Sequence, residues 1–199
     1  MIRAAIVGLG WWGRNLVNAV RDHGELIRFT VAHTRHPAPV ADFCREHDLR
    51  WVDDLETVLA DSSLDAVVFA TPHSLHAAQV QRAAAAGKSV FVEKPFTLSV
   101  ADAVATIEAA ESAGITLAVG FNRRFHPSMG HLRRAVRDSR LGTIVTITAE
   151  QTALWGLRMA ADAWRANPEE APTRRNPDPD EVYDPGTGIV MPARRPGGA

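Results

Sequence analysis

The chain of 199 residues is 46% hydrophobic and 23% charged, proportions that exclude a wholly disordered or collagen-like protein. Lys and Arg total 22 while Asp and Glu total 23, so the net charge of −1 gives no reason to expect a nucleic acid or a membrane as partner. The single cysteine, Cys44, excludes an intrachain disulfide and a multi-cysteine metal site, and it fits a cytoplasmic location.

Short apolar runs alternate with amphipathic segments along most of the chain. The first run, which ends at Gly8, predicts a buried strand rather than a signal peptide, because it is short and no cleavage site follows it. Strands are predicted over Ala4–Val7, Ile27–His33, Trp51–Val52, Ala66–Ala70, Ser89–Val92 and Thr116–Val119. Helices are predicted over Arg14–Arg21, Val40–His47, a segment opened by Asp53–Glu56, Ser74–Ala86 and Ser99–Ala113. This alternation implies an α/β fold with a Rossmann-type doubly wound parallel sheet.

The pattern changes after residue 122. A helix is predicted over Pro127–Asp138, and the period-two alternation of Thr143–Glu150 predicts a half-buried antiparallel strand. We therefore expect a Rossmann domain over residues 1–122 and the incomplete start of a second α/β domain over residues 123–167. Eleven of the last 32 residues are Pro or Gly, so residues 168–199 are expected to form a disordered tail.

A glycine-rich motif follows the first predicted strand. Residues Gly8-Leu9-Gly10-Trp11-Trp12-Gly13 match G-x-G-x-x-G between a strand and a helix, which is the context that a dinucleotide-binding site requires. Gly8 would permit a tight turn, Gly10 would let the backbone approach a pyrophosphate, and Gly13 would let the helix pack closely. The alternative is an ordinary glycine turn without a bound nucleotide. If a dinucleotide binds, Trp11 and Trp12 could contact it or pack at the rim of the site, and packing is favoured for at least one of them.

The end of the second predicted strand bears on the choice of cofactor. An acidic residue there would hold the ribose of NAD, but the sequence has Thr34 and Arg35, which could bind a 2′-phosphate. NADP is therefore favoured over NAD. The alternative is that Arg35 is a solvated loop residue and that either cofactor is accepted.

A lysine follows the fifth predicted strand, in Glu93-Lys94-Pro95. Pro95 favours an extended backbone at Lys94, which would lie at the carboxyl edge of the sheet. Partial burial could let this amine exchange a proton with a substrate hydroxyl, although the residues alone favour a surface lysine.

Four motifs together resemble the Gfo/Idh/MocA family of glucose-fructose oxidoreductase and inositol dehydrogenase relatives. In chain order they are GLGWWG, ATPHSLH (70–76), AGKSVFVEKP (86–95) and VGFNRRFHP (119–127), and the resemblance runs to about Pro172. It implies an NAD(P)-dependent oxidoreductase that transfers hydride between nicotinamide and a sugar, cyclitol or related polyol, with no metal. Full-length members often form homo-oligomers, so the same is a possibility for this chain.

The resemblance also implies roles for individual residues. Lys94 takes the position of the catalytic lysine. Further cofactor contacts are implied for Leu9, Thr71, Pro72, His73, His76, Glu93, Asn122 and Arg123. His73 stands where the family commonly has asparagine, His76 is either structural or near the cofactor, and Arg123 and Arg124 are equally compatible with an ion pair or a helix cap.

The sequence departs from the family after Pro172. Residues 173–199 match nothing in the family pattern, and their Arg, Pro, Gly and Ala bias is typical of a shifted reading frame in a GC-rich gene. We expect a truncated or frameshifted member. The alternative function is therefore a nucleotide-binding module without turnover, such as an inactive fragment or a redox sensor.

Overall fold

The structure is a computed structural model that describes all residues except 24, 149–166, 168–169, 171–180, 185–188 and 193–199. The chain divides into two compact units, Met1–Ala153 and Leu154–Ala199, and each is described by itself. None of the helices within the described residues is long and apolar enough to cross a membrane.

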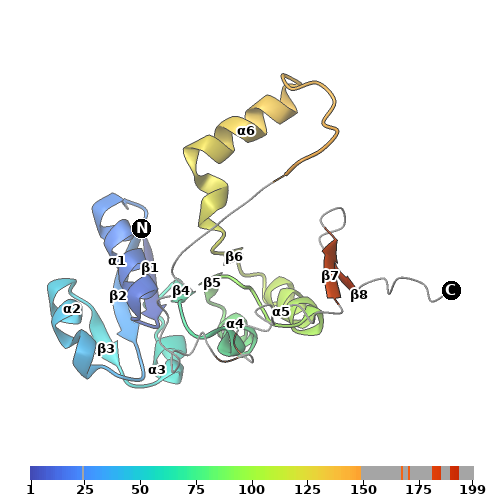
Figure 1. Cartoon of the computed structure of the whole chain (residues 1–199). Coiled ribbons are helices and arrows are strands. Elements are labelled where there is room, and N and C mark those ends of the chain that lie inside the picture. Colours follow the sequence, from blue (N-terminus) through green and yellow to red (C-terminus); the bar gives the residue numbers. More distant parts are fainter. Residues whose placement is uncertain (24, 149–166, 168–169, 171–180, 185–188, 193–199) are drawn as a thin grey trace. The chain divides into compact units, whose positions relative to one another are not determined.

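A six-stranded parallel sheet forms the centre of the first unit (Figure 1). Its strands lie in the spatial order β3-β2-β1-β4-β5-β6. Strands β2 and β3 are added on one side of β1 and strands β4 to β6 on the other, so the strand order reverses between β1 and β4. The strands are β1 (Ile2–Val7), β2 (Ile27–His33), β3 (Arg50–Val52), β4 (Ala66–Phe69), β5 (Ser89–Val92) and β6 (Leu117–Val119). The prediction of a Rossmann-type doubly wound sheet is confirmed.

Helices cover both faces of this sheet. The helices between its strands are α1 (Trp11–His23), α2 (Ala41–Glu46), α3 (Leu55–Ala60), α4 (His76–Ala85) and α5 (Val100–Ser112), with 3-10 turns at Ala38–Val40 and His73–Leu75. After β6 follow a 3-10 turn at Asn122–Phe125 and helix α6 (Pro127–Arg137). Ala4 and Ile6 of β1 belong to a core with residues of α1 and α2, whereas Ala5 and Val7 belong to a core with residues of α3 and α4. Successive β1 side chains therefore face opposite layers, which is why the whole run is apolar.

Helix boundaries follow local chemistry. Asp54 caps α3 by accepting from the Thr57 backbone N–H at 2.6 Å, and Ser99 caps α5 by accepting from Asp102 N–H at 3.0 Å. The Thr57 hydroxyl and N–H both donate to the Asp54 carboxylate, and they lower its pKa from the usual value. The first helix begins at Trp11, earlier than predicted, because the glycine motif itself forms its first turn.

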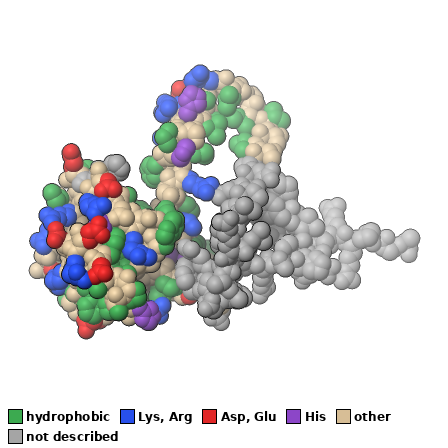
Figure 2. Space-filling model, turned by 60° about the vertical axis from the view of Figure 1, so that its left-hand side comes forward, with side chains coloured by type: hydrophobic (Ala, Val, Ile, Leu, Met, Phe, Trp, Pro, Cys, Tyr) green, Lys and Arg blue, Asp and Glu red, His purple; other side chains and the backbone are tan. Residues whose placement is uncertain are grey.

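The predicted strand at Thr143–Glu150 is wrong where the structure describes it. Residues 143–148 form no strand, and Val145 and Ile147 are 90% and 79% exposed, while residues 149 and 150 lie outside the described residues. A single strand cannot satisfy its backbone or bury its apolar side without a partner. Figure 2 shows hydrophobic side chains along α6 and the segment after it. The exposed apolar residues of this part include Met129, Leu132, Val136, Leu141 and Ile144.

The second unit contains one described element, an antiparallel hairpin of β7 (Glu181–Asp184) and β8 (Ile189–Pro192). The expectation of disorder throughout residues 168–199 is therefore wrong for these two segments. Their β-branched and aromatic residues, such as Val182, Tyr183 and Val190, favour strands despite the surrounding prolines and glycines. The other predicted tail residues lie outside the described residues, except Glu170.

Candidate functional site

Two glycines of the motif between β1 and α1 are required by the packing of the chain itself. Gly8 has a φ of +97°, and a Cβ there would lie 2.5 Å from the Ala70 carbonyl oxygen at the end of β4. A Cβ on Gly13 would lie 1.9 Å from the Gly8 carbonyl oxygen. The turn out of β1 and the first turn of α1 therefore lie against each other and against the end of the neighbouring strand.

Gly10 differs from these two, because a Cβ built on it would meet no atom of the described residues within 4 Å. Packing within the chain gives no reason for a glycine at this exposed position, whereas a ligand approaching the backbone would. The Leu9 side chain is buried in the core, so it does not cover the backbone of Gly10.

The first turn of α1 offers donors to an anion. The backbone N–H groups of Trp11, Trp12 and Gly13 have no intrahelical acceptor because they begin the helix. These groups and the helix dipole attract a phosphate, so the residues present fit the pyrophosphate of a dinucleotide.

The two tryptophans have different environments. Trp11 is 68% exposed and Trp12 is half-buried, and their ring centroids lie 5.4 Å apart. The Trp12 indole Nε1 is buried and has no hydrogen-bond partner among the described residues. Trp12 thus packs against the domain more than Trp11 does.

The end of β2 is connected directly to the glycine motif. Gly8 N–H donates to the His33 carbonyl at 2.8 Å, and His33 Nδ1 lies 3.1 Å from the Val52 carbonyl of β3. Thr34, half-buried, and Arg35, exposed, follow immediately. These two residues therefore start from a backbone that is bonded to the motif, and neither carries a carboxylate.

The loop after β4 is held by helix α4. Thr71, Pro72 and His73 are half-buried, and the Thr71 hydroxyl donates to Gln79 Oε1 at 2.6 Å. His76 is completely buried, with Nδ1 2.8 Å from the Pro95 carbonyl and Nε2 3.1 Å from the Thr71 carbonyl. Its ring joins the loop after β4 to the loop after β5.

The loop after β5 carries a buried carboxylate and an exposed lysine. Glu93 is only 7% exposed; its Oε2 accepts from Lys94 N–H at 3.2 Å, and its Oε1 has no partner among the described residues. The peptide bond between Lys94 and Pro95 is cis. Glu93 Oε1 is thus a buried acceptor at the carboxyl edge that could accept a bond from a ligand.

Gly120 is a site residue that the sequence reasoning missed. A Cβ on Gly120, the residue after β6, would lie 2.6 Å from Glu93 Oε1, so a glycine is needed to accommodate the carboxylate. The signal was available in a glycine that directly follows a predicted strand inside VGFNRRFHP. Asn122, Arg123 and Arg124 follow in an exposed 3-10 turn.

All the predicted site residues lie in the loops that follow the carboxyl ends of strands or in the helix and 3-10 turns that those loops enter. In a parallel sheet these ends share one edge, and ligands bind where the strand order reverses, here between β1 and β4. The structure therefore brings the glycine motif, the Thr71 loop and the Glu93-Lys94 loop to the same edge.

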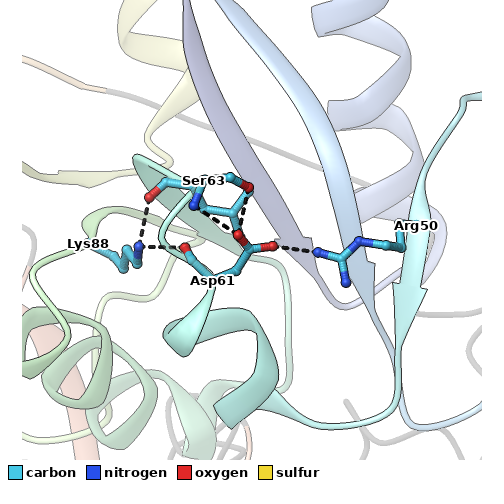
Figure 3. Close-up of polar contacts among 5 residues, drawn as sticks. Arg50, Asp61, Ser63 and Lys88 are labelled. Carbon is cyan, nitrogen blue, oxygen red and sulfur yellow. Dashed lines mark hydrogen bonds and ion pairs between the residues drawn. The ribbon is translucent and has the colours of Figure 1, made fainter.

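The amino edge of the sheet holds a different polar cluster (Figure 3). Lys88, 8% exposed, donates to the carbonyls of Asp61 and Leu64, both at 2.8 Å. The Asp61 carboxylate accepts from the Ser63 hydroxyl and N–H and pairs with Arg50, and these contacts lower its pKa from the usual value. Lys88 precedes β5, so the cluster fastens the amino ends of strands and lies away from the candidate site.

Known proteins resemble this chain over the part that contains these residues. The family model described as "Oxidoreductase family, NAD-binding Rossmann fold" matches residues 2–121. The chain is 35% identical over 146 residues to scyllo-inositol 2-dehydrogenase (NAD(+)) of Bacillus subtilis, covering 71% of this chain and 42% of that protein. It is 40% identical over 116 residues to D-xylose 1-dehydrogenase (NADP(+)) 2 of Haloferax volcanii, covering 58% of this chain and 35% of that protein.

Among solved structures, scyllo-inositol dehydrogenase from Lactobacillus casei with bound NAD(H) and scyllo-inositol superposes with a TM-score of 0.68. The identity is 28%, and the match covers 72% of this chain and 43% of that one. The chain spans less than half the length of the relatives that it matches.

Proposed function

Because the chain belongs to the Gfo/Idh/MocA oxidoreductase family, we propose that it binds NAD(P) and provides the nucleotide-binding domain of a sugar or polyol dehydrogenase. The observation that carries this proposal is Gly10, a glycine that the chain's own packing does not require, at the start of a helix with free backbone donors. The named relatives are dehydrogenases of inositol and xylose, which favours this function over a module without turnover.

Each part of the cofactor has a candidate partner at this edge. The N–H groups of the first α1 turn would hold the pyrophosphate, and Thr71 and Pro72 would line the groove leading from it. Glu93 Oε1 is a buried acceptor that a ribose hydroxyl would satisfy. Asn122 and Arg123, after the neighbouring strand β6, would contact the nicotinamide half.

Thr34 and Arg35 favour NADP. A 2′-phosphate would gain a charge-assisted bond from the Arg35 guanidinium and a bond from the Thr34 hydroxyl, and no acidic side chain at these positions would repel it. Relatives named for NAD and for NADP both occur, so the preference rests on these two residues.

Lys94 would act as the general acid–base group for the proton of the substrate hydroxyl. The bound cofactor would accept or donate the hydride. The exposed Lys94 amine, whose backbone is bonded to the Glu93 carboxylate, would hydrogen-bond the substrate hydroxyl and take up or return its proton.

Titration with NADPH and NADH, followed by tryptophan fluorescence, tests this function. We expect the wild type to bind NADPH more tightly than NADH. Arg35→Ala should weaken NADPH binding about tenfold, or about 1.4 kcal/mol, and leave NADH binding unchanged. Arg137→Ala, an exposed control on α6, should change neither affinity. Absence of binding to both cofactors would contradict the proposal, and an unchanged NADPH affinity in Arg35→Ala would contradict the NADP preference.

Turnover tests the role of Lys94 separately. With a panel of inositols and sugars, we expect NADP-dependent oxidation by the wild type and loss of at least about a hundredfold in rate in Lys94→Met, as expected for removal of a general acid–base group. Unaltered NADPH affinity in the same variant would show that the fold and the nucleotide site survive. A wild-type rate retained in Lys94→Met would contradict the assignment.

A further inference from the structure

The ring of His76 is the only completely buried ionisable side chain within the described residues, and it lies beneath the candidate site. It begins α4 and contacts two loops that follow neighbouring strands, through Nδ1 to the Pro95 carbonyl at 2.8 Å and through Nε2 to the Thr71 carbonyl at 3.1 Å. The His73 ring lies 5.8 Å away, measured between centroids. Because no atom of His76 is accessible, the side chain can influence a bound ligand only through these loops.

Both partners of the ring are acceptors, which limits what the ring can do. A carbonyl oxygen cannot donate, and a neutral imidazole carries one N–H, so a neutral ring bonds one loop and turns a lone pair toward the other. The shorter contact is the one from Nδ1 to Pro95.

The two loops also differ in how much they depend on the ring. Each loop starts from a residue that is bonded to the neighbouring strand, Ala70 N–H to the Val7 carbonyl at 2.8 Å and Glu93 N–H to the Phe69 carbonyl at 2.9 Å. The Thr71 loop has a further bond to α4, since the Thr71 hydroxyl donates to Gln79 Oε1 at 2.6 Å. Among the described residues, the corresponding contact of the Lys94 backbone is the longer one of 3.2 Å from its N–H to the Glu93 carboxylate. A bond to Pro95 therefore constrains the loop that is otherwise less constrained.

We propose that His76 is a positioning residue that carries its proton on Nδ1, donates it to the Pro95 carbonyl, and so fixes the Lys94 loop relative to the glycine motif. The inference rests on the proposed function, because it assigns the Lys94 loop to the nicotinamide half of the site. It predicts that the His76 ring affects binding of the nicotinamide half of the cofactor and does not affect binding of the half that the glycine motif holds.

Two substitutions separate the two bonds. In His76→Asn the amide nitrogen can take the place of Nδ1, and in His76→Gln it can take the place of Nε2. Asn can therefore retain the bond to Pro95, whereas Gln can donate only to Thr71. Binding is measured with NADPH and with 2′-phospho-ADP-ribose, and in parallel with NADH and ADP-ribose. The second ligand of each pair lacks nicotinamide. Thermal unfolding of both variants reports their stability.

We expect His76→Gln to bind the nicotinamide cofactor about five- to tenfold more weakly than the wild type, the loss typical of one hydrogen bond. His76→Asn should stay within about twofold of the wild type, and both variants should bind the ligand without nicotinamide as the wild type does. Equal weakening of both ligands in both variants, or weakening in Asn but not in Gln, would overturn the inference.

If the proposed function is wrong, the result differs, because the wild type would then bind none of the four nucleotides. Should both variants fail to fold, the ¹⁵N chemical shifts of the wild-type ring give the same test. A protonated Nδ1 supports the inference, and an Nδ1 without a proton overturns it while leaving the proposed function intact.

Discussion

Substitution of Gly10 by alanine separates binding from folding. A Cβ at Gly10 meets no atom within 4 Å in the part of the chain that the structure describes, so we expect the free energy of unfolding of Gly10→Ala to stay within about 0.5 kcal/mol of the wild type. The same methyl group would occupy the space through which a pyrophosphate approaches the backbone N–H groups. We therefore expect cofactor affinity to fall about a hundredfold, equivalent to about 2.7 kcal/mol.

Two other glycines provide the matched comparisons. Gly13→Ala would place Cβ 1.9 Å from the Gly8 carbonyl oxygen, and the backbone cannot move far enough to relieve this without loss of packing. We expect a cost of about 3 kcal/mol and, for a chain of this size, a fall in Tm of about 6–12 °C. Gly130→Ala, where the nearest atom is Arg134 Nη1 at 3.6 Å, should stabilise α6 by about 0.5–1 kcal/mol and leave cofactor affinity unchanged.

The assay combines urea unfolding with fluorescence titration of NADPH for all three variants. The reasoning is refuted if Gly10→Ala binds NADPH as tightly as the wild type. It is equally refuted if the loss of affinity in Gly10→Ala follows a loss of stability as large as that of Gly13→Ala.

Three further predictions test other parts of the fold. Gly120→Ala puts Cβ 2.6 Å from Glu93 Oε1 and should lower Tm. Adding Glu93→Asp should recover part of this loss, because the shorter side chain leaves room for the new methyl group. Strictly additive effects of the two substitutions on Tm would argue against the contact. Lys88→Met removes the donor to two carbonyls and should cost about 2–3 kcal/mol in urea unfolding, with NADPH affinity unchanged; an equal loss of affinity would contradict its structural role. The folded state lowers the pKa of Asp61, so its carboxylate stabilises the fold at pH values above its ordinary pKa of about 3.9, and this stabilisation is lost as the pH falls through the lower pKa of the folded state. Asp61→Asn should therefore be less stable than the wild type at pH 7, and the two stabilities should converge in acid. A difference in stability that stays constant across that pH range would contradict the assignment.

The sheet was predictable because its strands are apolar on both sides. Ala4 to Val7 must be buried whichever way each side chain faces, and the intervening helices carry apolar residues at helical spacing and capping residues such as Asp54 and Ser99. The sequence also indicated the glycine motif, since its position between a strand and a helix is local information.

Contacts between distant segments were not predictable in this way. The fit of Gly120 against Glu93 and the two carbonyls around His76 depend on strand order and on rotamers, which no local pattern specifies. The strand predicted at Thr143–Glu150 failed for a related reason, because alternation shows a tendency that is realised only when a partner strand is available. The β7–β8 hairpin was missed because the abundance of proline and glycine concealed two short runs of strand-forming residues.

The central claim is that the backbone N–H groups between β1 and α1 bind the pyrophosphate of a nicotinamide cofactor. Backbone amide chemical shifts of the ¹⁵N-labelled chain, recorded during addition of NADPH, test it most directly. We predict that the largest and saturable changes occur in the amides of Leu9 to Gly13. Changes confined to other parts of the chain, or no saturable change, would contradict the claim.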